Sequence, residues 1–85
     1  MNWHIQWSRN AINDMQKLDR PLKNRIWDSL NRMVKQPQLS DIKKLKGKTG
    51  EYRLRVGDWR VRFRVDFINR TYLITHVKHR RDIYR

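Results

Sequence analysis

A strict alternation of apolar and arginine side chains between residues 52 and 66 constrains the fold most. A period of two is that of a β-strand with one buried face. The alternation is interrupted once, at Gly57-Asp58, a pair typical of a two-residue hairpin turn. It therefore predicts two antiparallel strands, with apolar positions Tyr52, Leu54, Val56, Trp59, Val61, Phe63 and Val65, and arginines Arg53, Arg55, Arg60, Arg62 and Arg64.

The arginines are expected to form two adjacent rows on the face opposite the core. Residues two apart on a strand lie roughly 6.6 Å apart on one face. A solvated face whose charges deter edge pairing is the structural alternative, and it predicts a mixture of Lys, Glu and Thr. Five arginines relieved only by Asp66 fit that alternative poorly. The planar guanidinium binds two phosphate oxygens at once, so the pattern favours a polyanion site.

Two helices are predicted before this hairpin. Residues 3–7 alternate as a half-buried strand does, and Ser8 is a suitable N-cap for a helix that follows. The segment 19–21 marks a break and a restart, with Pro21 in a first helical turn, and Gln36-Pro37 ends the second helix. The apolar stripes are Ala11, Ile12, Met15 and Leu18, then Leu22, Ile26, Leu30, Met33 and Val34.

Residues 38–50 are expected to form a basic loop anchored by Leu45. Residues 68–70 look like a turn, and residues 71–77 like a third strand of the meander, with His76 on the same face as Tyr72 and Ile74. The whole chain, 1–85, is expected to be one α+β domain. In it an N-terminal strand, an α-helical hairpin and an antiparallel three-strand meander follow in order, and the sheet packs on the two helices.

Charge indicates the class of partner. The formal net charge is +13. Residues 1–41 carry 7 basic and 4 acidic residues, and residues 42–85 carry 14 and 4, so the excess rises from +3 to +10. Such an excess usually indicates nucleic acid. A membrane surface is the competing polyanion, but no amphipathic anchor helix adjoins the basic segment.

Composition excludes several other functions. The chain has no cysteine, so disulfides and thiolate catalysis are excluded, and a reducing cytoplasm is compatible. No signal peptide or membrane-spanning apolar run is visible. No carboxylate pair, metal-ligand cluster, Ser-His-Asp set or phosphate-cradling glycine loop is present, so neither metal nor cofactor is expected. The tryptophans at 3, 7, 27 and 59 are expected in the core.

A family resemblance rests on two segments. The run from Glu51 to Val65, preceded by Leu45-Lys46-Gly47, and the tail from His79 to Arg85 resemble the RelE branch of the RelE/ParE toxin superfamily. The strand-helix-helix opening has the family's length. The resemblance implies a RelE-like fold and a toxin that cuts mRNA in the ribosomal decoding site, without metal, by attack of the message's own 2′-hydroxyl. It further implies a cognate antitoxin.

Carried over residue by residue, the resemblance implies five catalytic positions. Arg81 is an alternative to Arg80, because the spacing to the tyrosine is shorter here than in some members. Some members have lysines at the positions of Arg53 and Arg55. A lysine can act as a base, whereas arginine remains charged, so the general base is unassigned. The implied catalytic residues are Arg53, Arg55, Arg60, Arg80 and Tyr84.

Other residues are expected to hold the RNA backbone without reading sequence. Histidine titrates near neutrality, so His76 and His79 are the candidates for the unassigned base, but a hydrogen-bonded structural role is the favoured expectation for each. Simple packing remains the alternative for Tyr84. Two further functions stay open, a non-catalytic RNA or ribosome binder and a ParE-type gyrase poison. The expected RNA-binding residues are Lys43, Lys44, Lys46, Lys48, Arg62, Arg64, His79 and Arg81.

Overall fold

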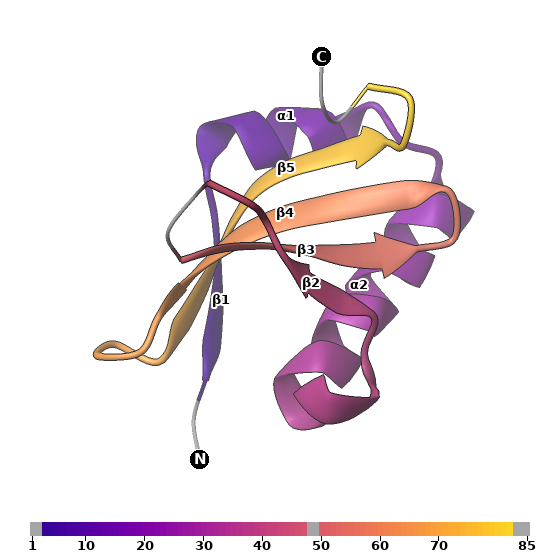
Figure 1. Ribbon diagram of the computed structural model, residues 1–85. Helices are drawn as coiled ribbons and strands as arrows, with labels where there is room; N and C mark the ends of the chain where they lie inside the picture. Colours follow the sequence, from indigo (N-terminus) through magenta and orange to yellow (C-terminus); the bar gives the residue numbers. More distant parts are fainter. Residues whose placement is uncertain (1–2, 48–49, 83–85) are drawn as a thin grey trace.

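The computed structural model describes residues 3–47 and 50–82. Helices and strands follow in the predicted order, which confirms the α+β class (Figure 1). Their bounds are β1 His4–Trp7, α1 Arg9–Gln16, α2 Arg20–Lys35, a short 3₁₀ helix Pro37–Leu39, β2 Ile42–Lys44, β3 Glu51–Val56, β4 Trp59–Asp66 and β5 Thr71–His79.

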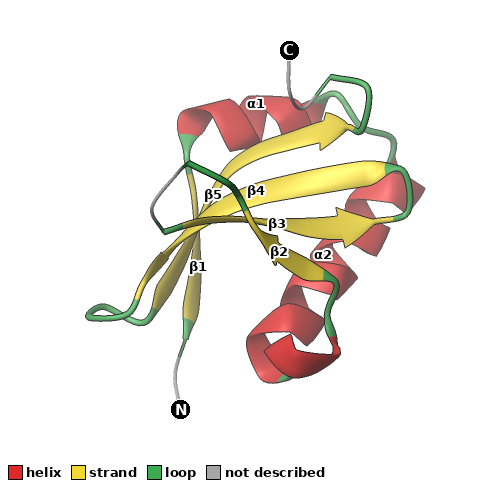
Figure 2. Cartoon of the chain, viewed as in Figure 1, coloured by secondary structure: helices red, strands yellow, loops and turns green. Residues whose placement is uncertain are grey.

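The five strands form one mixed sheet in the order β1-β5-β4-β3-β2. The three strands β3, β4 and β5 make the predicted antiparallel meander, and β2 adds to its outer edge antiparallel to β3. β1 instead pairs with β5 in parallel, with Ile5 opposite Tyr72 and Trp7 opposite Ile74. Figure 2 shows the sheet with α1 beside β5 and α2 crossing behind the other strands.

Helix α1 covers the part of the β5 edge that the short β1 leaves unpaired. The Ser8 hydroxyl caps the helix by accepting from the Ala11 amide at 3.1 Å, as predicted. Asp14 on this helix is buried, and its Oδ2 accepts a 2.9 Å hydrogen bond from the Val77 backbone amide. Its Oδ1 accepts a 2.7 Å bond from Lys78 Nζ. One carboxylate thus replaces a missing strand partner, which protects the edge.

Helix α2 packs its apolar stripe on the sheet and forms most of the helical side of the core. Asp19 caps it through a bond from the Leu22 amide, and the helix ends at Lys35 before Gln36-Pro37. Both helix boundaries therefore agree with the sequence patterns. The buried hydrophobic core consists of Ala11, Ile26, Leu30, Met33, Leu54, Val56, Val61, Phe63, Tyr72, Ile74 and Val77.

Three expectations about local structure were wrong. Residues 38–50 are not entirely loop, because Ile42–Lys44 pairs with β3 as a short strand. Trp27 is 45% exposed instead of buried, since it lies at the margin of the α2 stripe, where its ring stacks on Trp7 with centroids 6.1 Å apart. Ile12 is also 45% exposed, at the margin of the α1 stripe.

A fourth correction concerns His76. The register of β4 with β5 shifts between Arg62 and Phe63, so Arg62 lies opposite His76 whereas Phe63 lies opposite Ile74. Thr75 is the extra residue of a β-bulge, and an extra residue reverses which way the later side chains point. His76 therefore lies on the arginine face, not on the face of Tyr72 and Ile74.

Candidate functional site

The five hairpin arginines lie on the sheet face opposite the core, as the alternation predicted. Cross-strand partners lie within about 5.5 Å of each other at Cβ. Arg55 is therefore a neighbour of Arg60, which in turn faces Lys78. The next row of cationic and titratable side chains crosses four strands, in the order Lys43, Arg53, Arg62 and His76.

Three of the implied catalytic arginines meet at the β3–β4 turn. The Gly57 carbonyl accepts a 2.9 Å hydrogen bond from Arg60 Nη1 and a 3.4 Å bond from Arg55 Nε. Arg80 comes from beyond the end of β5, and its backbone amide donates to the Asp58 carbonyl at 2.8 Å. Its Nε lies 3.9 Å from Asp58 Oδ1. The turn thus gathers guanidiniums from two strands and the C-terminal segment.

A further arginine reaches the same turn and was not predicted. Gly57 has a φ of +61°, whereas the φ of Asp58 is negative. This is the pattern of a type II′ turn. A Cβ placed on Gly57 would lie 2.7 Å from Nη2 of Arg25, on α2. The glycine therefore serves both the backbone conformation and the approach of this guanidinium. No sequence signal links residues 25 and 57, because their contact is tertiary.

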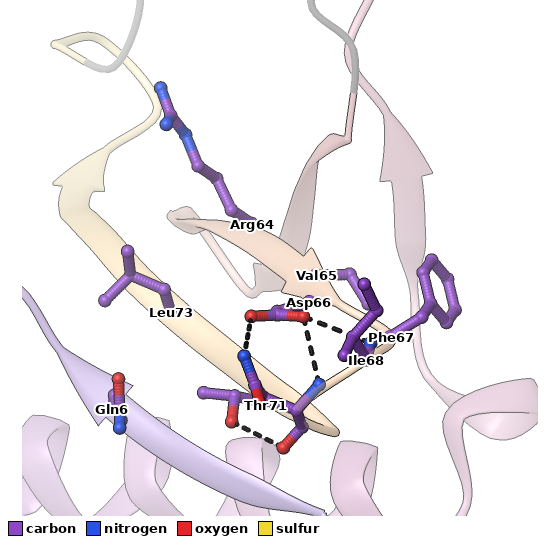
Figure 3. Close-up of a pocket in the computed structure, with 9 residues that line it drawn as sticks. Gln6, Arg64, Val65, Asp66, Phe67, Ile68, Thr71 and Leu73 are labelled. Carbon is purple, nitrogen blue, oxygen red and sulfur yellow. Dashed lines mark hydrogen bonds between the residues drawn. The ribbon is translucent and has the colours of Figure 1, made fainter.

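Glu51, not Asp66, is the carboxylate that pairs with Arg62 and Arg64. Glu51 Oε1 lies 3.4 Å from Arg62 Nη2 and 3.8 Å from Arg64 Nε. Asp66 instead binds the following turn, accepting from the backbone amides of Ile68 and Asn69 and from the Asn69 side chain (Figure 3). The side-chain hydrogen bond from Asn69, aided by the backbone bonds, lowers the pKa of Asp66. Figure 3 shows Arg64 extending away from this carboxylate.

Arg53 and Arg62 are held tightly in the middle of the face. Their side chains are 16% and 15% exposed. Arg53 Nη1 lies 3.7 Å from Asp41 Oδ1, which is an ion pair, but neither this nitrogen nor Arg62 Nε makes a hydrogen bond. A buried donor left without an acceptor costs about 1–3 kcal/mol. Such costs are expected where function, not stability, selects the residues.

His76 is set up on this face as a neutral imidazole. Burial lowers its pKa, and the charge of Arg62 lowers it further. The Thr75 hydroxyl donates to the Arg62 carbonyl at 3.3 Å, so its oxygen is left to accept from His76 Nδ1 at 3.0 Å. That network assigns the proton to Nδ1 and the lone pair to Nε2. The other charges acting on the ring come from Asp14, Lys78 and Glu51.

The remaining expected RNA-binding residues are dispersed. Lys43 lies opposite Arg53 on the arginine face, whereas Lys44 lies opposite Tyr52 and points the other way. Lys46 is in the following turn. His79 packs edge-on against Trp59 and accepts from the Arg81 amide, so it is tied to the apolar side of the sheet. Lys48 and Tyr84 lie outside the described residues.

Comparison with known families and structures identifies the group. A family model described as ParE toxin of type II toxin-antitoxin system, parDE, matches residues 5–84. The chain belongs to this toxin family. The match includes the first segment on which the RelE/ParE resemblance rested and the second up to residue 84, and it confirms the superfamily.

Solved structures share the toxin's fold. A chain of the RelB-RelE antitoxin-toxin complex from Methanococcus jannaschii is 26% identical with a TM-score of 0.77, over 93% of this chain and 94% of that one. A chain of the RelBE2 complex from Mycobacterium tuberculosis is 21% identical with a TM-score of 0.80, over 93% of this chain and 99% of that one. The isolated Escherichia coli RelE toxin is 15% identical with a TM-score of 0.78, over 92% of this chain and 84% of that one. Among curated proteins, no match to the sequence was found.

Residues 3–47 and 50–82 of the toxin contain neither a candidate membrane-spanning helix nor a cluster of metal-binding side chains. No helix there is long and apolar enough to cross a membrane. No group of three or more His, Asp or Glu side chains there is arranged to hold a metal ion.

Proposed function

We propose that this toxin is a RelE-type mRNA endonuclease that acts in the cytoplasm on messages in the ribosomal decoding site. The observation that supports this most directly is the meeting of Arg55, Arg60 and Arg80 at the Gly57-Asp58 turn. Cleavage of RNA by its own 2′-hydroxyl accumulates negative charge on the phosphorus oxygens. Fixed donors aimed at that charge stabilise it, because they need no reorganisation during the reaction.

The proposed step forms a bond between the 2′-oxygen and phosphorus and breaks the bond from phosphorus to the 5′-oxygen of the next nucleotide. The products are a 2′,3′-cyclic phosphate and a free 5′-hydroxyl. A base must take the 2′-proton, and an acid must protonate the departing oxygen. Arg80, with Arg81 as its alternative, and Tyr84 are the C-terminal groups proposed beside this phosphate.

His76 is our proposed base. Its Nε2 carries the lone pair, its depressed pKa keeps the ring unprotonated at neutral pH, and it shares the face with Arg53 and Arg62. An arginine does not serve as a base in proteins, since its pKa exceeds about 12. Among the described residues of this face, the imidazole is the group best suited to accept a proton near neutrality.

We further propose that a cognate antitoxin covers the arginine face and blocks entry to the ribosome. The family description places these toxins in toxin-antitoxin systems. The similar chain from Methanococcus jannaschii was solved in an antitoxin-toxin complex. A net charge of +13 suits an acidic partner segment.

A ParE-type gyrase poison is the second candidate, because the matching family model is the ParE toxin. A non-catalytic ribosome binder is the third. Mapping the 5′ ends of messages after a brief pulse of expression separates the three. The endonuclease produces new 5′-hydroxyl ends within translated messages. Intact messages on stalled ribosomes indicate binding alone, and induction of the DNA-damage response with intact messages indicates gyrase poisoning.

A further inference from the structure

A polar groove lies between α2 and the β3–β4 turn, next to the arginine face. Its volume is about 510 Å³, within the range of small-ligand sites. Its floor is the outer face of α2 and its wall is the end of β3 with Gly57. In Figure 1 the first turns of α2 pass behind the β3–β4 turn. The polar and charged residues that line the groove are Asn24, Arg25, Asp28, Ser29, Arg32 and Arg55.

The charged residues of α2 that line the groove form one stripe. Arg25, Asp28 and Arg32 are spaced three and four residues apart, which places them on one helical face. All three side chains are exposed. Within the described ranges, neither arginine makes an ion pair, with Asp28 or with any other carboxylate. Two guanidiniums at the surface are thus available to an external anion.

The groove is continuous with the arginine face through two residues. Arg55 belongs to both, because it lines the groove and is also the cross-strand neighbour of Arg60. Gly57 is the other link, since its carbonyl binds Arg60 and its missing side chain leaves room for Arg25. A polyanionic strand that follows these residues passes from the arginine face around the turn and onto α2, over a lining in which Pro21 and Val56 are the apolar side chains.

The mixture of charges indicates which polyanion fits. Each of the three guanidiniums can bind two oxygens of one phosphate, so together they suit a strand that carries several phosphates. Asp28 repels a phosphate but accepts a hydrogen bond from a hydroxyl. A ribose supplies that hydroxyl and a deoxyribose does not, and the 2′-hydroxyl is what distinguishes RNA from DNA. Every nucleotide of an RNA strand carries this hydroxyl, whereas an acidic peptide carries a hydroxyl only where it has Ser, Thr or Tyr.

We propose that this groove binds the ribose-phosphate backbone of an RNA strand, with Arg25 and Arg32 on phosphates and Asp28 on a 2′-hydroxyl. The RNA strand bound here is the one that flanks the cut, so this inference rests on the proposed endonuclease function. Arg25 and Arg32 bind the strand and take no part in the reaction itself.

The test compares Arg25→Gln/Arg32→Gln with the charge-matched control Arg9→Gln/Lys17→Gln on α1. Glutamine keeps a good helix former at each position, and thermal melts establish that both variants fold. Binding to a short single-stranded RNA of mixed sequence is measured against salt. Losing two phosphate contacts lowers the magnitude of the log–log salt slope by about 1.4. An unchanged slope in the groove variant, or an equal drop in the control, overturns the proposal.

Two further measurements test the proposal, the preference for RNA over DNA and the kinetics of message cleavage. Asp28→Ala removes the acceptor and is expected to reduce the preference of the toxin for RNA over DNA of the same sequence, and an unchanged preference removes Asp28 from the site. The groove variant is also expected to raise the KM for message cleavage on ribosomes while kcat stays the same. If the wild type binds RNA with the full slope but cuts nothing, the endonuclease proposal fails and the groove stands. If the wild type cuts and both variants match it in slope, the groove alone fails.

Discussion

His76 faces Arg62 across the β4–β5 ladder only because Thr75 is the extra residue of a bulge. The lowered pKa of His76 has a defined consequence for stability. Between its folded pKa and its ordinary value of 6.5, the unfolded chain binds more protons than the folded one. The free energy of unfolding therefore falls as pH drops through that window. The stabilising contribution of the neutral His76 ring is lost below the folded pKa.

We predict that His76→Gln reduces the dependence of both the free energy of unfolding and the cleavage rate on pH at the acidic end, which we call the acid limb. Cleavage by the wild type should rise through the pKa of His76 and reach a plateau at neutral pH, because the base must be unprotonated. The variant should lose rate by about 10²–10⁴-fold and lose the limb. Single-turnover cleavage from pH 5 to 8 measures this, with the exposed His4→Gln as control. A wild-type limb that persists in His76→Gln would falsify the assignment.

Removing the proposed phosphate-binding pair, Arg60→Ala with Arg80→Ala, is expected to abolish detectable message cleavage. One preorganised donor of this kind contributes about 2.7–4 kcal/mol to the barrier. Since Arg60 also bonds to the Gly57 and Trp59 carbonyls, a melt must establish that the variant is folded. The charge-matched control is Arg9→Ala with Lys17→Ala. Normal growth inhibition by the folded Arg60/Arg80 variant would contradict the site assignment.

The buried carboxylate of Asp14 should be a main determinant of stability. In Asp14→Ala, the Val77 amide loses its acceptor and Lys78 loses its ion-pair partner. A buried donor without a partner costs about 1–3 kcal/mol, and urea denaturation measures the change. Asp14→Asn keeps an acceptor for Val77 and should lose less. Equal losses in the two variants would show that the bond to Val77 contributes little.

Gly57→Ala tests the turn at which the arginines meet. The left-handed backbone conformation costs a non-glycine residue about 1–2 kcal/mol, and the new methyl group must also displace the Arg25 guanidinium. Gly47→Ala is the matched control, because Gly47 also has a positive φ but has no atom within 4 Å of the added Cβ. RNA binding should weaken only in Gly57→Ala. Equal effects at the two glycines would mean that the position of Arg25 is unimportant.

The parts of the fold that local patterns determine could be predicted from sequence. The period of two placed all five hairpin arginines on one face, and the Ser8 cap and the break at residues 19–21 located the helix starts. The bulge at Thr75 could not be predicted, because it depends on how β5 pairs with β4. The strand at 42–44 was missed because three residues, two of them lysines, carry too little pattern.

Predictions about counterions failed for a related reason. The alternation of side chains along the strand predicted Asp66 on the arginine face, but its carboxylate accepts hydrogen bonds from the turn that follows it. Glu51 was not considered, although it has the same parity as Arg53 and lies within ion-pair distance of two arginines. Arg25 could not be found at all, since its position against Gly57 depends on how α2 crosses the sheet.

The parallel pairing of β1 with β5 affects how this toxin is made. His4 to Trp7 find their partners in Thr71 to Ile74, so the first strand to be synthesised waits for the last. Contacts of such long sequence separation slow folding, because a large loop must close before they form. A nascent chain therefore cannot complete its sheet until β5 has left the exit tunnel of the ribosome that makes it.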